Sequence, residues 1–255
     1  MHVYIEYTDA FGVVYNGNYL KFFDRALHRT DQLRLDGWSI VRVGEQKFKQ
    51  SPTLGGTFVI EGVRKEVHDA YEIWDMDMKS FDNSIVFNSV TDVRIAKAVK
   101  GDIALPTDPP FDIPKDGVLA TDQFYAYRDE FEPHLQGAMP LRNVLNLFER
   151  SRSNYLGGPD VLREMQTKEG IIFVVTNIED ACLIDDGTTC CAGDEVVVET
   201  AFVAKRKGMV LDCLQTLKHG TARLAQAKVR VMVLNASTMR PTNQLPESLK
   251  RTLNL

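Results

Sequence analysis

The sequence predicts an α+β fold made of two tandem units, each a central helix wrapped by a curved antiparallel β-sheet, joined as a pseudo-dimer. Three observations predict it: an internal repeat, the same succession of helical and strand patterns in both halves, and a proline-rich stretch between them. We therefore expect a first unit over residues 1–105, a linker over 106–118 and a second, diverged unit over 119–255.

The repeat rests on two anchors that keep their order along the chain. A shift of 125 positions lays residues 12–26 over 137–151, and a shift of 129 lays residues 94–105 over 223–234. Two ordered matches with nearly equal shifts favour duplication over chance. The first anchor matches Gly12/Gly137, Asn18/Asn143, Leu20/Leu145, Phe23/Phe148, Arg25/Arg150 and the acids Asp24/Glu149.

Each half repeats one pattern: a short strand, a turn, an amphipathic helix and a series of strands. In the first helix Asn18 stands at the expected N-cap and Asp36-Gly37 marks the end. The sheet must wrap each helix, because nothing else covers the helix's apolar stripe. That stripe is Tyr19, Phe22, Phe23, Ala26 and Leu33; strands are expected at 57–67, 71–81, 84–96, 171–184, 195–206 and 209–219, with turns at Asp82-Asn83 and Lys207-Gly208.

The stretch between the halves, residues 105–117, contains four prolines and several acids, which prevent a regular helix or strand ladder. A proline-stiffened chain of this kind suits a strap that crosses a surface between two packed units. At the other end, the tail is expected to finish in a short helix from Pro246 that serves as a lid or a packing element.

Composition argues against several classes of function. The net charge of -5 comes from 30 basic and 35 acidic residues spread along the chain, so no nucleic-acid partner is expected. No apolar stretch is long enough to span a membrane, and no signal peptide is visible. The cysteines fit neither a disulfide framework nor a zinc site, so no cofactor or metal is expected. The expected location is the cytoplasm, or an organelle lumen if a targeting segment precedes residue 1 in the natural chain.

Residues 3–26, VYIEYTDAFGVVYNGNYLKFFDRA, resemble the opening signature of the 4-hydroxybenzoyl-CoA thioesterase family. In that signature a strand leads to an Asp, a Gly-Val-Val-Tyr turn, an Asn-Tyr and the central helix. The resemblance implies the hot-dog fold, hydrolysis of acyl-CoA or acyl-carrier-protein thioesters, and a role in fatty acid or polyketide metabolism. It also implies that the fused pair replaces a homodimer with active sites at its interface. A larger homo-oligomer of the double unit stays open.

Asp9 stands at the family's carboxylate position. The resemblance implies that it acts as a nucleophile or as general base for water, because a carboxylate is ionised near neutral pH. Its alternative role is to organise the turn before Gly12. The start of the following helix offers free N–H groups and a positive dipole end to a developing oxyanion. The expected catalytic set is therefore Asp9, Tyr15, Asn16, Gly17 and Asn18, with Tyr15 and Asn16 orienting the thioester or its water.

Two departures from the family bear on the substrate class: Asn16 replaces a common His, and Tyr7 replaces a residue that is frequently acidic. Tyr19, at the start of the helix, is expected to bind substrate. Gly55-Gly56 could bring a backbone amide near the acyl group or form a loop hinge, and the two readings stay open.

The second half differs at the corresponding positions. His134 takes the place of Asp9, and Pro140-Leu141-Arg142 replaces Tyr15-Asn16-Gly17. We therefore expect one working site around Asp9, with the second half supplying opposite walls that include His134. Arg142 could meet a phosphate of CoA or of a carrier's prosthetic arm, or it could be a solvated side chain.

Two other functions stay open. Hot-dog dehydratases and hydratases pair a His with an acid on the central helix, and His134 with Glu149 could form such a pair. A non-catalytic acyl-binding module, in which Asp9 is a relic, would bind long acyl chains without turnover.

Overall fold

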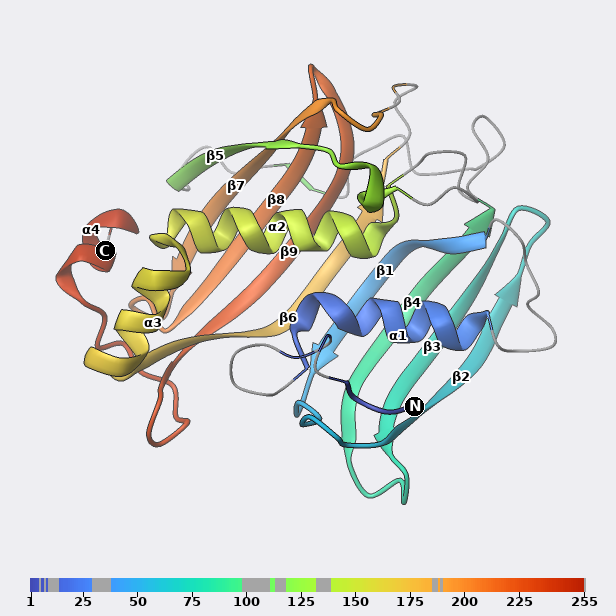
Figure 1. The fold of residues 1–255 in the computed structure, drawn as a ribbon, viewed down its shortest axis with the longest axis horizontal. Helices are drawn as coiled ribbons and strands as arrows, with labels where there is room; N and C mark the ends of the chain where they lie inside the picture. The colour runs from blue at the N-terminus through green and yellow to red at the C-terminus, as the bar shows by residue number, and fades with distance from the viewer. Residues whose placement is uncertain are drawn as a thin grey trace.

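The computed structural model describes residues 1–4, 6, 8, 14–28, 38–97, 111–112, 118–131, 139–184, 188 and 190–254. Nine strands in this part of the chain form a single antiparallel sheet, and the helices α1 and α2 lie on one face of it (Figure 1). The helical elements are η2 (Asn16–Asn18), α1 (Tyr19–Leu27), η3 (Arg128–Glu130), α2 (Leu141–Tyr155), α3 (Gly158–Lys168) and α4 (Glu247–Thr252). The strands are β1 (Trp38–Phe48), β2 (Phe58–Val67), β3 (Tyr71–Ser80), β4 (Val86–Lys97), β5 (Val118–Tyr125), β6 (Ile171–Leu183), β7 (Glu195–Lys205), β8 (Val210–His219) and β9 (Ala222–Asn235).

The strand order repeats between the halves. The sheet runs β2-β3-β4-β1-β6-β9-β8-β7-β5, so β2-β3-β4-β1 in the first half corresponds to β7-β8-β9-β6 in the second. The halves meet where β1 pairs antiparallel with β6, with Glu45 opposite Glu179. This arrangement confirms the expected fold class, two helix-and-sheet units in tandem. The boundaries proposed for the units stay a prediction, because most of the linker lies outside the described residues.

The core lies between the helices and the inner face of the sheet. In α1 the side chains of Phe22 and Phe23 are almost fully buried, and in α2 Leu147 and Phe148 are buried to the same degree. Burial of a side chain of this size contributes about 1.5–3 kcal/mol each, so the helical stripe of each half is a main source of stability.

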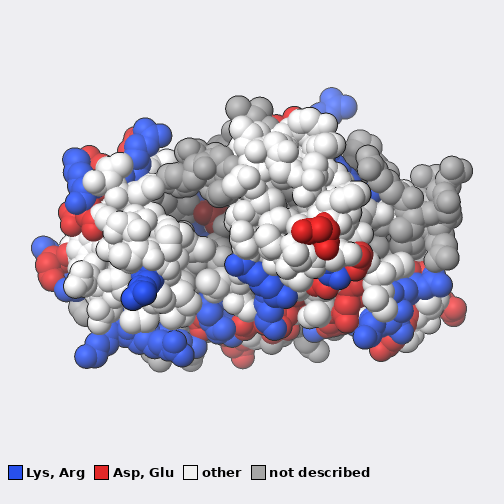
Figure 2. Space-filling model, turned by 90° about the horizontal axis from the view of Figure 1, so that it is seen from below, with Lys and Arg blue, Asp and Glu red and all other residues white. Residues whose placement is uncertain are grey.

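The outer face of the sheet is charged. Along β3, Trp74, Met76 and Met78 are buried, and the residues that alternate with them carry charges. Two of these charged residues pair with β2, in the Asp75–Lys65 ion pair of 3.5 Å and the Lys79–Glu61 ion pair of 2.6 Å. Figure 2, a view from below, shows Lys and Arg beside Asp and Glu along the lower border of the molecule. Alternating inward and outward side chains are the expected pattern of a sheet with one solvated face.

Most predicted elements are present. The strand runs at 57–67, 71–81 and 84–96 correspond to β2, β3 and β4, and those of the second half to β6, β7 and β8. Positive φ angles of 58° at Asn83 and 57° at Lys207 confirm the two turns. The tail helix α4 begins after Pro246, and it packs rather than caps a site: Leu249 is buried, and the Tyr155 hydroxyl donates to Thr252 O at 2.9 Å.

Four expectations differ from the structure. α1 ends at Leu27, short of the predicted end at Asp36-Gly37, although residues 29–37 lie outside the described part. Asn18 is the N-cap residue but makes no side-chain cap hydrogen bond, because η2 already continues into α1. β5 begins at Val118, one residue inside the predicted linker. β1 was not predicted, since Arg42, Gly44 and Gln46 interrupt its apolar pattern; the buried Gln46 amide donates to Asn88 Oδ1 at 3.0 Å.

Among the described residues, none of the helices is both long and apolar enough to cross a membrane.

Candidate active site at the junction of the two halves

The first central helix starts with a tight turn. Tyr15 is extended at φ -64° and ψ 133°, and the 3-10 turn η2 then runs directly into α1. The amide of Asn18 donates to Tyr15 O at 2.9 Å, and that of Tyr19 donates to Asn16 O. The amides of Asn16 and Gly17 lie at the start of this turn, where no carbonyl of the helix can accept a hydrogen bond from them. They therefore have no acceptor within the helix, and they lie at its positive dipole end; Gly17 itself is buried.

The second central helix starts in the same way. Pro140 is extended at φ -67° and ψ 149°, close to the angles of Tyr15, and α2 begins at the next residue. The repeat shift of 125 positions therefore holds for the helix starts. It makes Gly17 equivalent to Arg142, Lys21 to Asn146, and Asp24 to Glu149.

Glu149 of α2 meets the start of the first helix across the junction. Its Oε2 accepts a hydrogen bond from Asn16 Nδ2 at 3.5 Å, and the same oxygen is bound by Arg152 Nη2. Arg152 is itself held from behind, because its Nη1 donates to Oε1 of the fully buried Gln215. Gln215 Nε2 in turn donates to Phe148 O at 2.9 Å. A buried polar network of the second half thus fixes a carboxylate that reaches the first half.

Gly17 lets the two halves approach closely. A Cβ atom at this position would lie 2.1 Å from Asn146 Oδ1 and 2.9 Å from the Tyr15 ring. Real Cβ atoms essentially never show contacts this short, so any other residue would force the Asn146 side chain, or α2 with it, to shift. The buried Asn146 Oδ1 finds no hydrogen-bond partner among the described residues.

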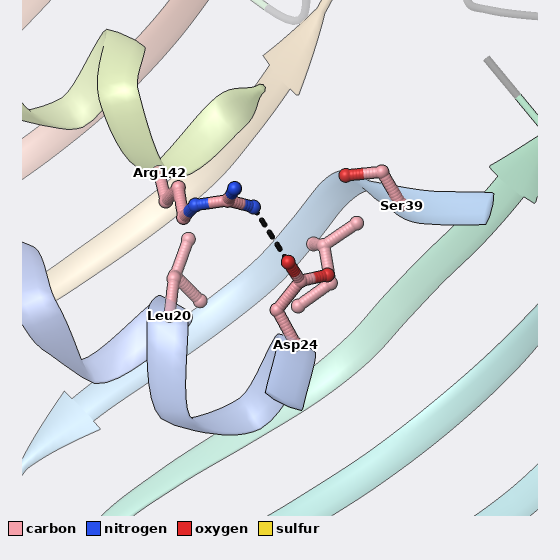
Figure 3. Close-up of a pocket in the computed structure, with 5 residues that line it drawn as sticks. Leu20, Asp24, Ser39 and Arg142 are labelled. Atoms are coloured by element: carbon pink, nitrogen blue, oxygen red, sulfur yellow. Dashed lines mark hydrogen bonds and ion pairs between the residues drawn. The ribbon is translucent and has the colours of Figure 1, made fainter. Parts of the chain in front are cut away.

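The equivalent contact between the start of α2 and the helix α1 is closed by an ion pair. Arg142 Nη1, from the start of α2, lies 2.5 Å from Asp24 Oδ2 on α1, and the two side chains are 14% and 13% exposed. Figure 3 shows this ion pair spanning the gap between the helices, above β1. Leu20, Ser39 and Ile40 complete a crevice too narrow to hold a water molecule. Burial, with Arg142 and Arg25 nearby, lowers the pKa of Lys21 on the same helix.

The structure brings together part of the predicted site. Tyr15, Asn16, Gly17 and Asn18 form the turn that faces α2. Asp9 and His134 lie outside the described residues. Tyr19 is buried in the core, where its ring packs edge to face against Phe48 with centroids 5.1 Å apart.

Two predicted binding positions have other partners. The Gly55 amide donates to Val3 O at 3.0 Å and the Gly56 amide to Thr53 O at 2.9 Å, so both amides are used within a turn. The φ of 78° at Gly55 agrees with the hinge reading. Arg142 is bound to Asp24 and mostly buried rather than solvated, and its contact with a phosphate stays a prediction.

The sequence assigns no role to Asn146 or Arg152, and it presents Glu149 as the repeat partner of Asp24 and as the acid of a possible His–acid pair. A helical pattern could have identified the set, because Arg142, Asn146 and Glu149 stand at positions i, i+4 and i+7 and so share one face of α2. The role of this polar face is visible only in the structure, where Arg142 contacts Asp24 and Glu149 contacts Asn16 of the first half.

The described part of the chain contains no group of His, Cys, Asp and Glu side chains that could hold a metal ion. Burial raises the pKa of Cys182 to about 11 and that of Cys213 to about 12, which makes both thiols poor nucleophiles.

Solved structures share this fold. A 12:0-ACP thioesterase from Umbellularia californica aligns with a TM-score of 0.61 at 11% identity, over 95% of this chain and 92% of that one. An acyl-ACP thioesterase from Bacteroides thetaiotaomicron gives 0.58 at 13% identity, over 91% and 95%. A protein with a hot dog fold from Alicyclobacillus acidocaldarius gives 0.55 at 14% identity, over 91% of each chain. No family model and no curated protein matches the sequence.

These alignments span both halves, so the tandem hot-dog fold expected from the sequence is confirmed. At such low identity the likeness concerns the fold, and function has to be argued from the site.

Proposed function

We propose that this protein hydrolyses acyl thioesters at the junction where the turn before α1 meets α2. The observation that carries the proposal is the contact of Asn16 with Glu149, which joins the start of one central helix to the middle of the other. Amides without an intrahelical acceptor at a helix start suit a reaction that develops negative charge on a carbonyl oxygen. The negative charge of the nearby Glu149 is offset by its ion pair with Arg152. The names of two structural neighbours, both thioesterases acting on acyl-ACP, favour an acyl chain on an acyl carrier protein as the substrate. An acyl-CoA substrate rests on the resemblance of residues 3–26 alone.

In the proposed mechanism, Asp9 acts as the nucleophile or as the general base for water. The amides of Asn16 and Gly17 would stabilise the oxyanion, with the helix dipole adding to their effect. In this proposal Gly17 serves twice, because it supplies a backbone amide and, having no side chain, lets Asn146 of α2 pack against it.

Glu149 would set the orientation of Asn16. It accepts from Asn16 Nδ2, so the carboxamide oxygen of Asn16 is left to turn away from Glu149. That oxygen can accept a hydrogen bond from the attacking water and hold it for Asp9. The second half therefore contributes a positioning group to the site rather than a second catalytic centre.

The test is a thiol-trapping assay over a panel of acyl-CoAs and acyl-carrier-protein thioesters, with wild type and Asp9→Asn compared. We expect release of free thiol by the wild type and a fall of about 10²–10⁴-fold in kcat for Asp9→Asn, with an unchanged thermal unfolding curve. Asp160→Asn, a change of the same kind on the exposed side of α3, should leave turnover intact. Undiminished turnover in Asp9→Asn would remove Asp9 from the mechanism.

The same panel separates the two other functions. A hydratase or dehydratase using His134 and Glu149 would change the absorbance of the enoyl thioester without releasing thiol. An acyl-binding module would bind the ligands and turn none of them over. Against the first stands the ion pair of Glu149 with Arg152, which already occupies the carboxylate in a structural network.

A further inference from the structure

A tandem pair of hot-dog units contains two pseudo-equivalent corners at its junction, each made by the helix start of one half and the central helix of the other. In an isologous contact, residue i of one unit meets j of the other and the equivalent of j meets the equivalent of i. Here Asp24 meets Arg142, and Glu149, the equivalent of Asp24, meets Asn16 beside Gly17, the equivalent of Arg142. The two contacts are thus the two halves of one symmetric interface.

We propose that Arg142 closes a second acyl-binding position at the Asp24 corner, so that each chain takes one acyl thioester, at the Glu149 corner. This inference rests on the proposed function for the identity of the ligand, but the closure itself stands on contacts alone.

The two corners differ in the side chain at one pair of equivalent positions. Arg142 stands at the Asp24 corner, and Gly17 stands at the Glu149 corner. At the Glu149 corner, position 17 has no side chain, and the neutral Asn146 and the Tyr15 ring lie beside it. Glu149 is reached there by the 3.5 Å contact from Asn16. At the Asp24 corner, the guanidinium lies 2.5 Å from the carboxylate, and the crevice that remains cannot hold a water molecule.

The closure is not a gate that opens readily. Both side chains of the ion pair are more than four-fifths buried, so moving Arg142 outward would leave the Asp24 carboxylate without its strongest partner in a poorly solvated place. Lys21 lies near Arg142 on the facing helix, and burial together with that guanidinium lowers the pKa of Lys21. The Asp24 corner therefore acts as a clamp between the central helices.

The first test measures closure without any acyl ligand. In a background with Cys190→Ser and Cys191→Ser, Ser39→Cys places a thiol in the crevice, where Ser39 is 4% exposed. Arg142→Gly combined with Asp24→Asn removes the plug without stranding a buried charge. We expect iodoacetamide to label Cys at position 39 at least about tenfold faster in this variant than in Asp24→Asn alone, which retains the arginine.

Equal labelling rates in those two proteins, with Cys182 and Cys213 unlabelled throughout, would overturn the proposal. So would fast labelling of Ser39→Cys while Asp24 and Arg142 are both intact.

The second test counts ligands. Isothermal titration with the non-hydrolysable thioether S-dodecyl-CoA should give one ligand per chain for wild type and for Asp24→Asn, and two for Arg142→Gly/Asp24→Asn. Two ligands on the wild type, or one on the double variant with its fold intact, would contradict the inference. If the wild type neither binds this ligand nor hydrolyses any thioester, the proposed function fails, and the labelling rates alone decide whether Arg142 closes the corner.

Discussion

The carboxylates of Asp24 and Glu149 occupy equivalent places on the two central helices, and each is held by an arginine from a different source. Asp24 is bound by Arg142, which comes from the opposite half. Glu149 is bound by Arg152 from the next turn of its own helix, and its remaining contact across the junction is the amide of Asn16. An arginine in trans closes a corner, whereas an arginine in cis leaves the facing side of the carboxylate accessible to the other half.

The difference shows how a duplicated pair can lose its symmetry without losing its fold. Position 17 and position 142 lie at the same place in the same kind of helix start, with nearly the same backbone angles before them. One glycine and one arginine at that place are enough to make one corner a candidate site and the other a clamp.

The largest effect should come from the arginine in cis. Arg152→Met removes the guanidinium from Gln215 Oε1 and from Glu149, whose carboxylate then keeps only its long contacts with Asn16 and Ser153. Because the place is mostly buried, we expect a loss of about 3–5 kcal/mol in the free energy of unfolding, measured in urea. Glu149→Gln in the same chain should restore part of that loss. Arg163→Met on the exposed side of α3 is the control, with an expected change below about 0.5 kcal/mol. An Arg152→Met protein as stable as that control would show that the network does not hold Glu149.

Gly17→Ala should destabilise the Glu149 corner next most. The added methyl group would lie 2.1 Å from Asn146 Oδ1, and overpacking of this kind costs about 1–3 kcal/mol. Asn146→Ala in the same chain removes the clashing oxygen and should recover most of the stability, which a thermal unfolding series of the two single variants and the double variant would measure. Absence of any recovery would place the clash elsewhere.

The clamp itself should give a smaller, measurable coupling. A double-mutant cycle of Asp24→Asn and Arg142→Gln should yield a coupling energy of about 1–2 kcal/mol, because the pair is shielded from solvent. The Lys168–Glu164 pair of α3, with side chains 69% and 63% exposed, should give about 0.3–0.5 kcal/mol in the same experiment. Equal coupling in the two pairs would mean that the Asp24 corner is not clamped.

The smallest effect concerns Lys21, which stands in the clamp corner where the other corner has Asn146. Its folded-state pKa is below the 10.5 of an unfolded chain because of burial, Arg142 and Arg25. The folded protein therefore binds this proton less tightly, so stability should rise as pH increases from the folded pKa toward 10.5. Lys21→Asn should remove that rise and, after allowance for solvent screening, gain a few tenths of a kcal/mol near pH 7. Urea midpoints across this pH range would show it, with the exposed Lys49→Asn as control.

Much of the fold could be predicted from local pattern. Some features depend only on residues a few positions apart, so they can be recognised in the sequence alone. They are the helical spacing of Phe22 and Phe23, the alternation along β3 and the residues at the two turns. β1 could not be predicted in this way. Its buried Gln46 is satisfied by Asn88, which is 42 positions away in the chain, and a distant partner leaves no local trace.

The sequence by itself determined that the chain is a duplicated helix-and-sheet unit, and that the turn around residues 15–18 leads into a central helix. It also showed that the halves differ at positions 17 and 142. Only the tertiary structure decided the effect of that difference. Arg142 contacts Asp24, which is 118 positions away in the chain, and Glu149 contacts Asn16, which is 133 positions away. Contacts between halves depend on how two sheets join at β1 and β6, and no periodicity within either half encodes that pairing.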